Sequence, residues 1–182
     1  MSDYHRAKIK KLHRLLKRRP GDRQSRMDLC LLHMKRREYA QALEQLRSIR
    51  KDPQAVPEVL DRMEAIISYS SGDLDRARGL FESLSRSARE DTEIEQYLAR
   101  IAVNRGDLAG GIAHLEKALQ FGGVGGELMN DLGVLYFLTD RYPEAEVLLR
   151  DAIRQDPQYM QAYRNLADLC ERTKRVVEAA SV

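Results

Sequence analysis

The stretch that decides the fold is residues 126–159, which read GELMNDLGVLYFLTDRYPEAEVLLRDAIRQDPQY. Near its middle, the polar pair Asp140-Arg141 separates two segments that are rich in apolar residues. In the second segment, Ala145, Leu149 and Ala152 recur at a spacing that places them on one face of an α-helix. The stretch therefore predicts two helices joined by a short turn, with an apolar stripe along the second.

The same turn recurs along the chain at a nearly constant period. Gly72-Asp73-Leu74 returns 34 residues later as Gly106-Asp107-Leu108, and Asp140-Arg141-Tyr142 follows after another 34. We place two further turns at Arg37-Glu38-Tyr39 and at Lys174-Arg175-Val176. After each of the first four turns, the apolar stripe begins with a small residue, which lets two antiparallel helices approach closely. The spacing predicts an array of helix–turn–helix units.

A period of 34 residues is that of the tetratricopeptide repeat (TPR), and the chain resembles this family over roughly residues 20–182. In residues 126–159, Met129 replaces the family's leading Trp, and Pro157 closes the unit. The resemblance implies an all-α, right-handed TPR superhelix, an α-solenoid of about five repeats with an N-terminal basic helix. The residues of this stretch that match the family pattern are Leu132, Gly133, Tyr136, Ala145, Leu149 and Ala152.

The expected organisation is a basic N-terminal helix at 1–22, which forms a partial repeat or cap, followed by a TPR solenoid at 23–182. We expect repeats at about 23–55, 56–90, 91–125, 126–158 and 159–182. The expected helix pairs are 23–36 with 39–51, 56–70 with 74–87, 91–104 with 108–120, 126–139 with 142–155, and 159–173 with a helix from 176 onward.

The net charge of +3 conceals an uneven distribution. Residues 1–26 contain ten Lys or Arg and two Asp, whereas the remainder of the chain carries a net negative charge. This basic arm has three interpretations: a solvated outer face of a capping helix, a site for anionic lipid or an acidic protein, or a nucleic-acid site. Nucleic acid is the least favoured, because stacking on single strands needs aromatic residues and only Tyr4 is present. The residues of the basic arm that we single out are Lys8, Lys10, Lys11, Arg14, Lys17, Arg18 and Arg19.

In the family, the first helix of each repeat lines a concave groove, and the resemblance assigns groove positions here. It implies a non-catalytic scaffold or adaptor that binds a peptide or helix, in a groove that is apolar at the N-terminal end and polar at the C-terminal end. The alternative is that some of these residues pack against neighbouring helices. Met27 and Leu31 occupy the positions where chaperone-binding members carry Lys and Asn, which argues against a carboxylate clamp. The expected groove residues are Met27, Leu31, Met34, Arg62, Met63, Ile66, Tyr69, Gln96, Tyr97, Arg100, Asn104, Asn130, Asp131, Val134, Phe137, Arg164, Asn165 and Asp168.

The sequence offers no chemistry for catalysis or metal binding. Acidic residues, His and Cys form no triad or ligand-spaced cluster, so we expect no enzyme, no cofactor and no metal. Cys30 and Cys170 are expected to be small buried hydrophobes. No apolar run approaches the roughly 20 residues of a membrane span. We therefore expect a cytoplasmic protein, peripheral at a membrane if the basic arm binds one.

Two glycine clusters depart from the repeat pattern. Gly111 stands where three other repeats have Ala, so we expect Gly111→Ala to stabilise the helix by something under about 1 kcal/mol. Residues 122–126 read GGVGG and replace the usual proline turn. We interpret them as a hinge or loose joint rather than a phosphate-binding loop, since no strand precedes them and no Lys-Ser/Thr follows.

A second function hypothesis is self-assembly. We expect an incomplete fifth repeat to leave Leu169, Val176 and Val177 exposed at an apolar edge, so that copies associate into a homo-oligomer. Scaffolds of this class include magnetosome-associated TPR proteins that coat a bacterial organelle. A third hypothesis is a membrane-associated assembly factor that uses the basic arm.

Overall fold

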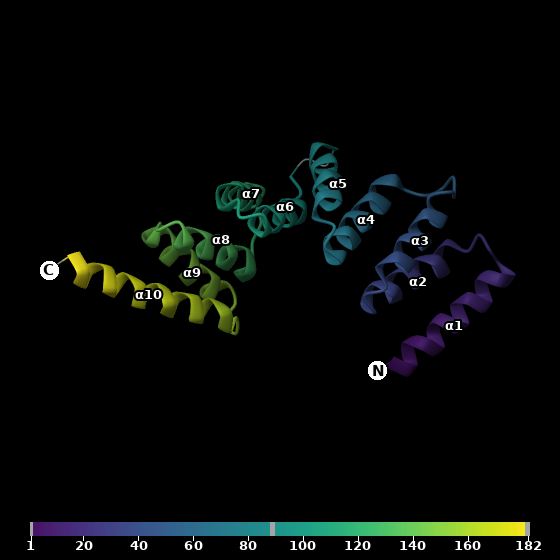
Figure 1. Cartoon of the computed structure of the whole chain (residues 1–182), viewed down its shortest axis with the longest axis horizontal. Coiled ribbons are helices and arrows are strands. Elements are labelled where there is room, and N and C mark those ends of the chain that lie inside the picture. The colour runs from purple at the N-terminus through teal and green to yellow at the C-terminus, as the bar shows by residue number, and fades with distance from the viewer. Residues whose placement is uncertain (1, 88–89, 181–182) are drawn as a thin grey trace. The chain divides into compact units, whose positions relative to one another are not determined.

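The computed structural model describes residues 2–87 and 90–180, and the side chains of residues 4–87 and 90–174. The described residues form ten α-helices and no strand, so the chain is all-α as expected (Figure 1). The helices are α1 (Ser2–Arg18), α2 (Arg23–Lys35), α3 (Tyr39–Ile49), α4 (Pro57–Ser71), α5 (Leu74–Ser87), α6 (Thr92–Asn104), α7 (Leu108–Gln120), α8 (Gly126–Leu138), α9 (Tyr142–Gln155) and α10 (Met160–Ala180).

The chain divides into two compact units, Met1–Ser87 and Ala88–Val182. In the N-terminal unit, α2 packs with α3 and α4 with α5, and α1 lies against α2. In the C-terminal unit, α6 packs with α7 and α8 with α9, and α10 lies against both α8 and α9. Because only two or three residues join the members of each pair, the paired helices run antiparallel. These are the helix–turn–helix units that the period predicts.

The recurring turn has one backbone conformation in all four pairs. Its first residue has a positive φ, at 59° for Arg37, 86° for Gly72, 79° for Gly106 and 59° for Asp140. The amide of the next residue then donates to a carbonyl five residues back, as in Asp73 N to Ser68 O at 2.9 Å. This hydrogen bond satisfies a carbonyl that the end of the helix would otherwise leave without a donor. The period visible in the sequence is therefore the period of these helix ends.

The expected fifth turn at Lys174-Arg175-Val176 is wrong, because these residues lie within the continuous helix α10. No Gly or Pro occurs between Met160 and Ala180, so no residue interrupts the helix locally. The turn at Arg37 forms although Arg37 is not a Gly. There, the packing of α3 against α2 supports the turn.

The apolar stripes of the second helices form the cores of the two units. Ala145, Leu149 and Ala152 are completely buried, as the stripe predicts. Apolar contacts also hold the basic helix α1, since Leu12 is buried against Leu29 and Leu32 of α2. Buried residues of the two cores are Cys30, Ala42, Leu46, Ile49, Leu60 and Ile67 in the N-terminal unit, and Ala99, Leu115, Ala118, Leu128, Leu132, Leu135, Tyr136, Ala145, Leu149 and Leu169 in the C-terminal unit.

The burial of Leu169 and of the two cysteines differs in part from the expectation. Leu169 is only 1% exposed and belongs to the core, so its assignment to an exposed edge is wrong. Cys30 is buried, and burial raises the pKa of its thiol to about 11, but Cys170 is exposed and the expectation of burial there is wrong. The side chains of Val176 and Val177 lie outside the described residues.

The packing around Gly111 and Gly123 bears on the two expectations about glycines. A Cβ on Gly111 would lie 2.7 Å from Cγ2 of Val103 and 3.1 Å from Cδ1 of Leu135, so the position lacks room for Ala as the core stands. A Cβ on Gly123 would lie 2.6 Å from the carbonyl oxygen of Ala118 and 2.8 Å from Cδ2 of Leu128. The 122–126 loop is therefore closely packed at Gly123, whereas a Cβ on Gly122 or Gly125 would meet nothing within 4 Å, and the interpretation as a hinge or loose joint stays a prediction.

Candidate binding site

Polar side chains of α6 and α8 meet in the C-terminal unit. Arg100 of α6 donates to Glu127 of α8 at 2.5 Å, and its guanidinium also lies 3.8 Å from a carboxylate oxygen of Asp131. Glu127 and Asp131 are four residues apart, so they occupy the same face of α8. One guanidinium on α6 thus lies close to two carboxylates on α8.

The contacts continue from α8 to α10 through two asparagines. Asn130 is 3% exposed, and its amide oxygen accepts a hydrogen bond of 2.7 Å from Nδ2 of Asn165. Nδ2 of Asn130 in turn donates to Asp131 at 3.4 Å. Arg100, Asp131, Asn130 and Asn165 therefore form a connected series across the first helices α6, α8 and α10, which we call the polar ladder.

Asp131 is a perturbed carboxyl group within the polar ladder. Partial burial raises the pKa of its carboxyl above the usual value, and this effect exceeds the opposing influence of Arg100. The negative charge of Glu127 acts in the same direction. Burial likewise raises the pKa of Tyr159, and the charges of Asp131 and Glu127 raise it further. The ladder therefore holds a carboxylate that lacks full solvation and has capacity for a further donor.

The other groove residues expected in this unit lie around the ladder with different degrees of burial. Asn104 is exposed, and its amide donates 2.7 Å to the carbonyl of Arg100 within the same helix. Phe137 is half-buried against the core, with its ring centroid 6.0 Å from that of Tyr142. Of the rest, Gln96, Tyr97 and Val134 are half-buried, and Arg164 and Asp168 are exposed.

The expected groove residues of the N-terminal unit are mainly packing residues. Met27, Met34 and Met63 are half-buried against the core of that unit. Leu31 is 45% exposed and lies toward α1, where it lines a small pocket with Lys8. Arg62, Ile66 and Tyr69 are half-buried. The apolar character that the sequence shows at this end thus arises largely from methionines that complete the core.

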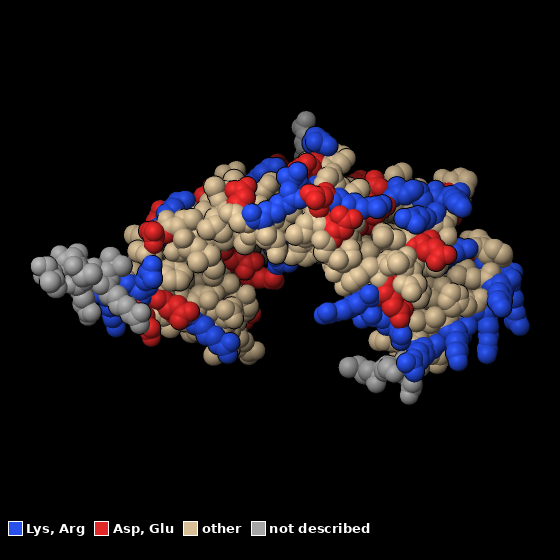
Figure 2. All heavy atoms as spheres, in the orientation of Figure 1, with Lys and Arg blue, Asp and Glu red and all other residues tan. Residues whose placement is uncertain are grey.

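The basic arm lies on α1 and on the turn that follows it. Figure 2 shows Lys and Arg side chains gathered over this helix. All seven singled-out cations are exposed, while Ile9, Leu12 and Leu16 on the opposite side contact α2. The helix is therefore amphipathic, and its cationic side faces solvent.

Two residues of the site were missed from the sequence. Glu127 could have been found, because it precedes Asp131 by one helical turn and is acidic in the first turn of α8. Tyr159 gave no signal, because its relation to Asp131 depends on how the chain folds back before α10. No metal cluster of His, Cys, Asp or Glu occurs among the described side chains. Over the described ranges, no helix is both long and apolar enough to cross a bilayer.

Solved structures with the same fold include a crystal structure of MamA protein, with a TM-score of 0.70 at 15% identity over 87% of this chain and 86% of that one. YrrB, described as a TPR protein with an unusual peptide-binding site, gives a TM-score of 0.66 at 13% identity, covering 90% and 84%. The first TPR of Spaghetti (RPAP3), solved with the HSP90 peptide SRMEEVD bound, gives 0.61 at 11% identity, covering 64% and 93%.

Among curated proteins, none matches this chain in sequence. The family model of the tetratricopeptide repeat matches residues 62–125, 98–159 and 130–182, which together span more than half of the chain. With its recurring turns and paired helices, the chain belongs to the tetratricopeptide-repeat family.

Proposed function

We propose that the chain is a non-catalytic interaction scaffold that binds a peptide or helix along the first helices of its C-terminal unit. TPR folds generally act as scaffolds for protein–protein interaction. Two of the similar structures support a peptide as ligand: the RPAP3 domain was solved with one bound, and YrrB is described as having a peptide-binding site.

The polar ladder is the observation that carries the proposal. Asn165 is half-buried, its Nδ2 donates to Asn130 and its Oδ1 accepts from Gln161. One N–H and one oxygen lone pair of its amide remain for the N–H and C=O groups of a peptide backbone. Asp131 has a carboxylate that is disfavoured by partial burial, so a peptide N–H or a cationic side chain that approached it would relieve this cost. Groups with a perturbed pKa cluster at functional sites, which favours this surface as a recognition site.

The test is a peptide-display selection on the wild-type chain, followed by affinity measurements on two variants. Asp131→Asn removes the negative charge of the partly buried carboxyl in the ladder, and we expect selected peptides to bind it about tenfold more weakly, or about 1.4 kcal/mol. Glu146→Gln is the matched control, because Glu146 forms a surface ion pair with Arg150 within α9, outside the ladder. Equal affinities for both variants and the wild type would contradict the proposal.

A second candidate function rests on α1. Its exposed cations lie opposite an apolar side that is already anchored on α2, so they remain available to an anionic partner. We infer that α1 attracts an anionic lipid surface, and that this attraction weakens as salt screens it.

A further inference from the structure

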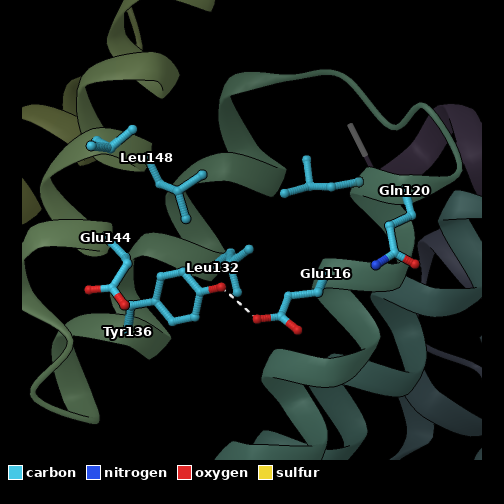
Figure 3. A pocket seen from close by; sticks show the side chains of 8 residues that line it. Glu116, Gln120, Leu132, Tyr136, Glu144 and Leu148 are labelled. Atoms are coloured by element: carbon cyan, nitrogen blue, oxygen red, sulfur yellow. Dashed lines mark hydrogen bonds between the residues drawn. The ribbon is translucent and has the colours of Figure 1, made fainter.

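A groove of about 420 Å³ lies between the second helices α7 and α9, away from the polar ladder (Figure 3). Leu132 and Tyr136 of α8 form its floor, and the side chains of α7 and α9 form its two walls. This volume is within the range of pockets that hold a ligand, roughly 300–1,000 Å³. The groove therefore has room for bulky side chains of a partner.

The interior of the groove is mostly apolar. Leu119 of α7 and Leu148 of α9 are half-buried on its walls, and Val147 is 56% exposed. The floor residues Leu132 and Tyr136 are almost completely buried and belong to the core of the unit. An aliphatic side chain placed here would cover apolar surface on a rigid base, at roughly 25 cal/mol for each Å² removed from water.

The rim of the groove carries two carboxylates and one guanidinium. The hydroxyl of Tyr136 donates to Glu116 at 2.6 Å, and Figure 3 shows the tyrosine ring between Glu116 and Glu144. The guanidinium of Arg141 lies 3.8 Å from the centre of this ring. It pairs with Glu144 at 3.0 Å and lies 3.8 Å from Glu116. One guanidinium thus faces two carboxylates, and the rim retains a net negative charge.

Both carboxylates remain accessible to a partner. Glu116 is 41% and Glu144 is 47% exposed. A hydrogen bond from its own backbone amide and a second from Arg141 hold the pKa of Glu144 below its usual value, so this group is charged at neutral pH. A cation at the rim would complete the arrangement, whereas an acidic segment or a phosphate would meet repulsion.

We propose that this groove is a second docking site, for a cationic amphipathic segment of another protein that inserts one bulky aliphatic side chain. Its Lys or Arg residues lie about one turn away from that side chain and pair with Glu116 and Glu144 at the rim. The charge pattern of the rim selects the segment, and the apolar floor supplies the contact area. The lining of this groove shares no residue with the polar ladder, so we expect that both partners can be bound together.

The probe is a fluorescently labelled peptide with one Leu flanked by Lys residues, and binding to the full chain is followed by anisotropy. We expect saturable binding that weakens as salt is added. Glu144→Lys should raise the Kd about tenfold, or about 1.4 kcal/mol. Glu146→Lys is the matched control, because it makes the same charge change on the same helix but outside the groove lining, and should leave the Kd nearly unchanged. Circular dichroism checks that both variants are folded.

Several outcomes would overturn the proposal. Equal weakening by the two charge changes would show non-specific attraction, and undiminished binding of a peptide with Ala in place of Leu would show that no side chain is inserted. Weaker binding to Asp131→Asn would place the probe on the polar ladder instead. Concentration-dependent dimerisation of the chain that Glu144→Lys abolishes would show that the occupant is a second copy.

Discussion

Two glycines within second helices respond in opposite ways to the same substitution. Gly79 lies in α5, and a Cβ there would meet nothing within 4 Å. Gly79→Ala should therefore gain the difference in helix propensity, about 0.8–1 kcal/mol. For a chain of this length, that gain raises Tm by roughly 2–4 °C.

Gly111→Ala gains the same propensity but meets the core. The new Cβ would lie 2.7 Å from Cγ2 of Val103, and a β-branched side chain in a helix has essentially one rotamer and cannot rotate away. Overpacking of this kind costs about 1–3 kcal/mol. Subtracting the gain in propensity leaves a net destabilisation of about 1 kcal/mol, opposite in sign to the effect expected from the sequence.

Urea unfolding followed by far-UV circular dichroism measures both changes against the wild type. Val103→Ala provides a further control, because it removes the methyl that the new Cβ would meet. In that background, Gly111→Ala should become stabilising, and the difference between the two backgrounds is the coupling energy. If Gly111→Ala stabilised the wild-type chain as much as Gly79→Ala does, the steric explanation would be refuted.

Three further predictions concern the proposed surfaces. Asn165→Leu removes the donor to the buried oxygen of Asn130, and we expect a destabilisation of about 1–3 kcal/mol in urea unfolding. Asp131→Asn should be more stable than the wild type at neutral pH, because the pKa of Asp131 is raised in the folded state and ionisation therefore opposes folding. This advantage should shrink as the pH falls through the raised pKa toward the usual Asp value, and a pH series of unfolding curves that showed a constant advantage would contradict it. Replacing Lys8, Lys10 and Lys11 by Gln should weaken binding to phosphatidylserine vesicles in low-salt co-sedimentation, whereas absence of wild-type binding would leave α1 as a solvated face.

The sequence predicted the helix pairs well, because turns and stripes are local signals. The expected helices 74–87, 108–120 and 142–155 coincide with α5, α7 and α9, and the bounds of the others from α2 to α8 differ by at most two residues. The predictions that failed depend on tertiary contacts. Whether a Cβ fits at Gly111 depends on Val103 across the helix pair, and the burial of Leu169 depends on how α10 lies against α8 and α9.

The candidate site was predicted as a set of positions rather than as a network. Arg100, Asn130, Asp131 and Asn165 were all named from the repeat register. Their contacts could not be read in advance, because the lateral offset between successive first helices decides which side chains meet. The groove between α7 and α9 was missed, since its acidic rim and apolar floor come from three different helices.

The close contact within each helix pair has a consequence for exchanging parts between repeats. The third pair places Ala99 opposite Gly111, the fourth places Gly133 opposite Ala145, and the second has Ala65 and Ala77. Both facing residues are thus small in these three pairs, and the glycine belongs to the second helix in the third pair and to the first helix in the fourth. A chimera that joined α8 to a second helix with the sequence of α7 would bring Gly133 and Gly111 together and leave the crossing underfilled, so both helices of a pair should be exchanged together.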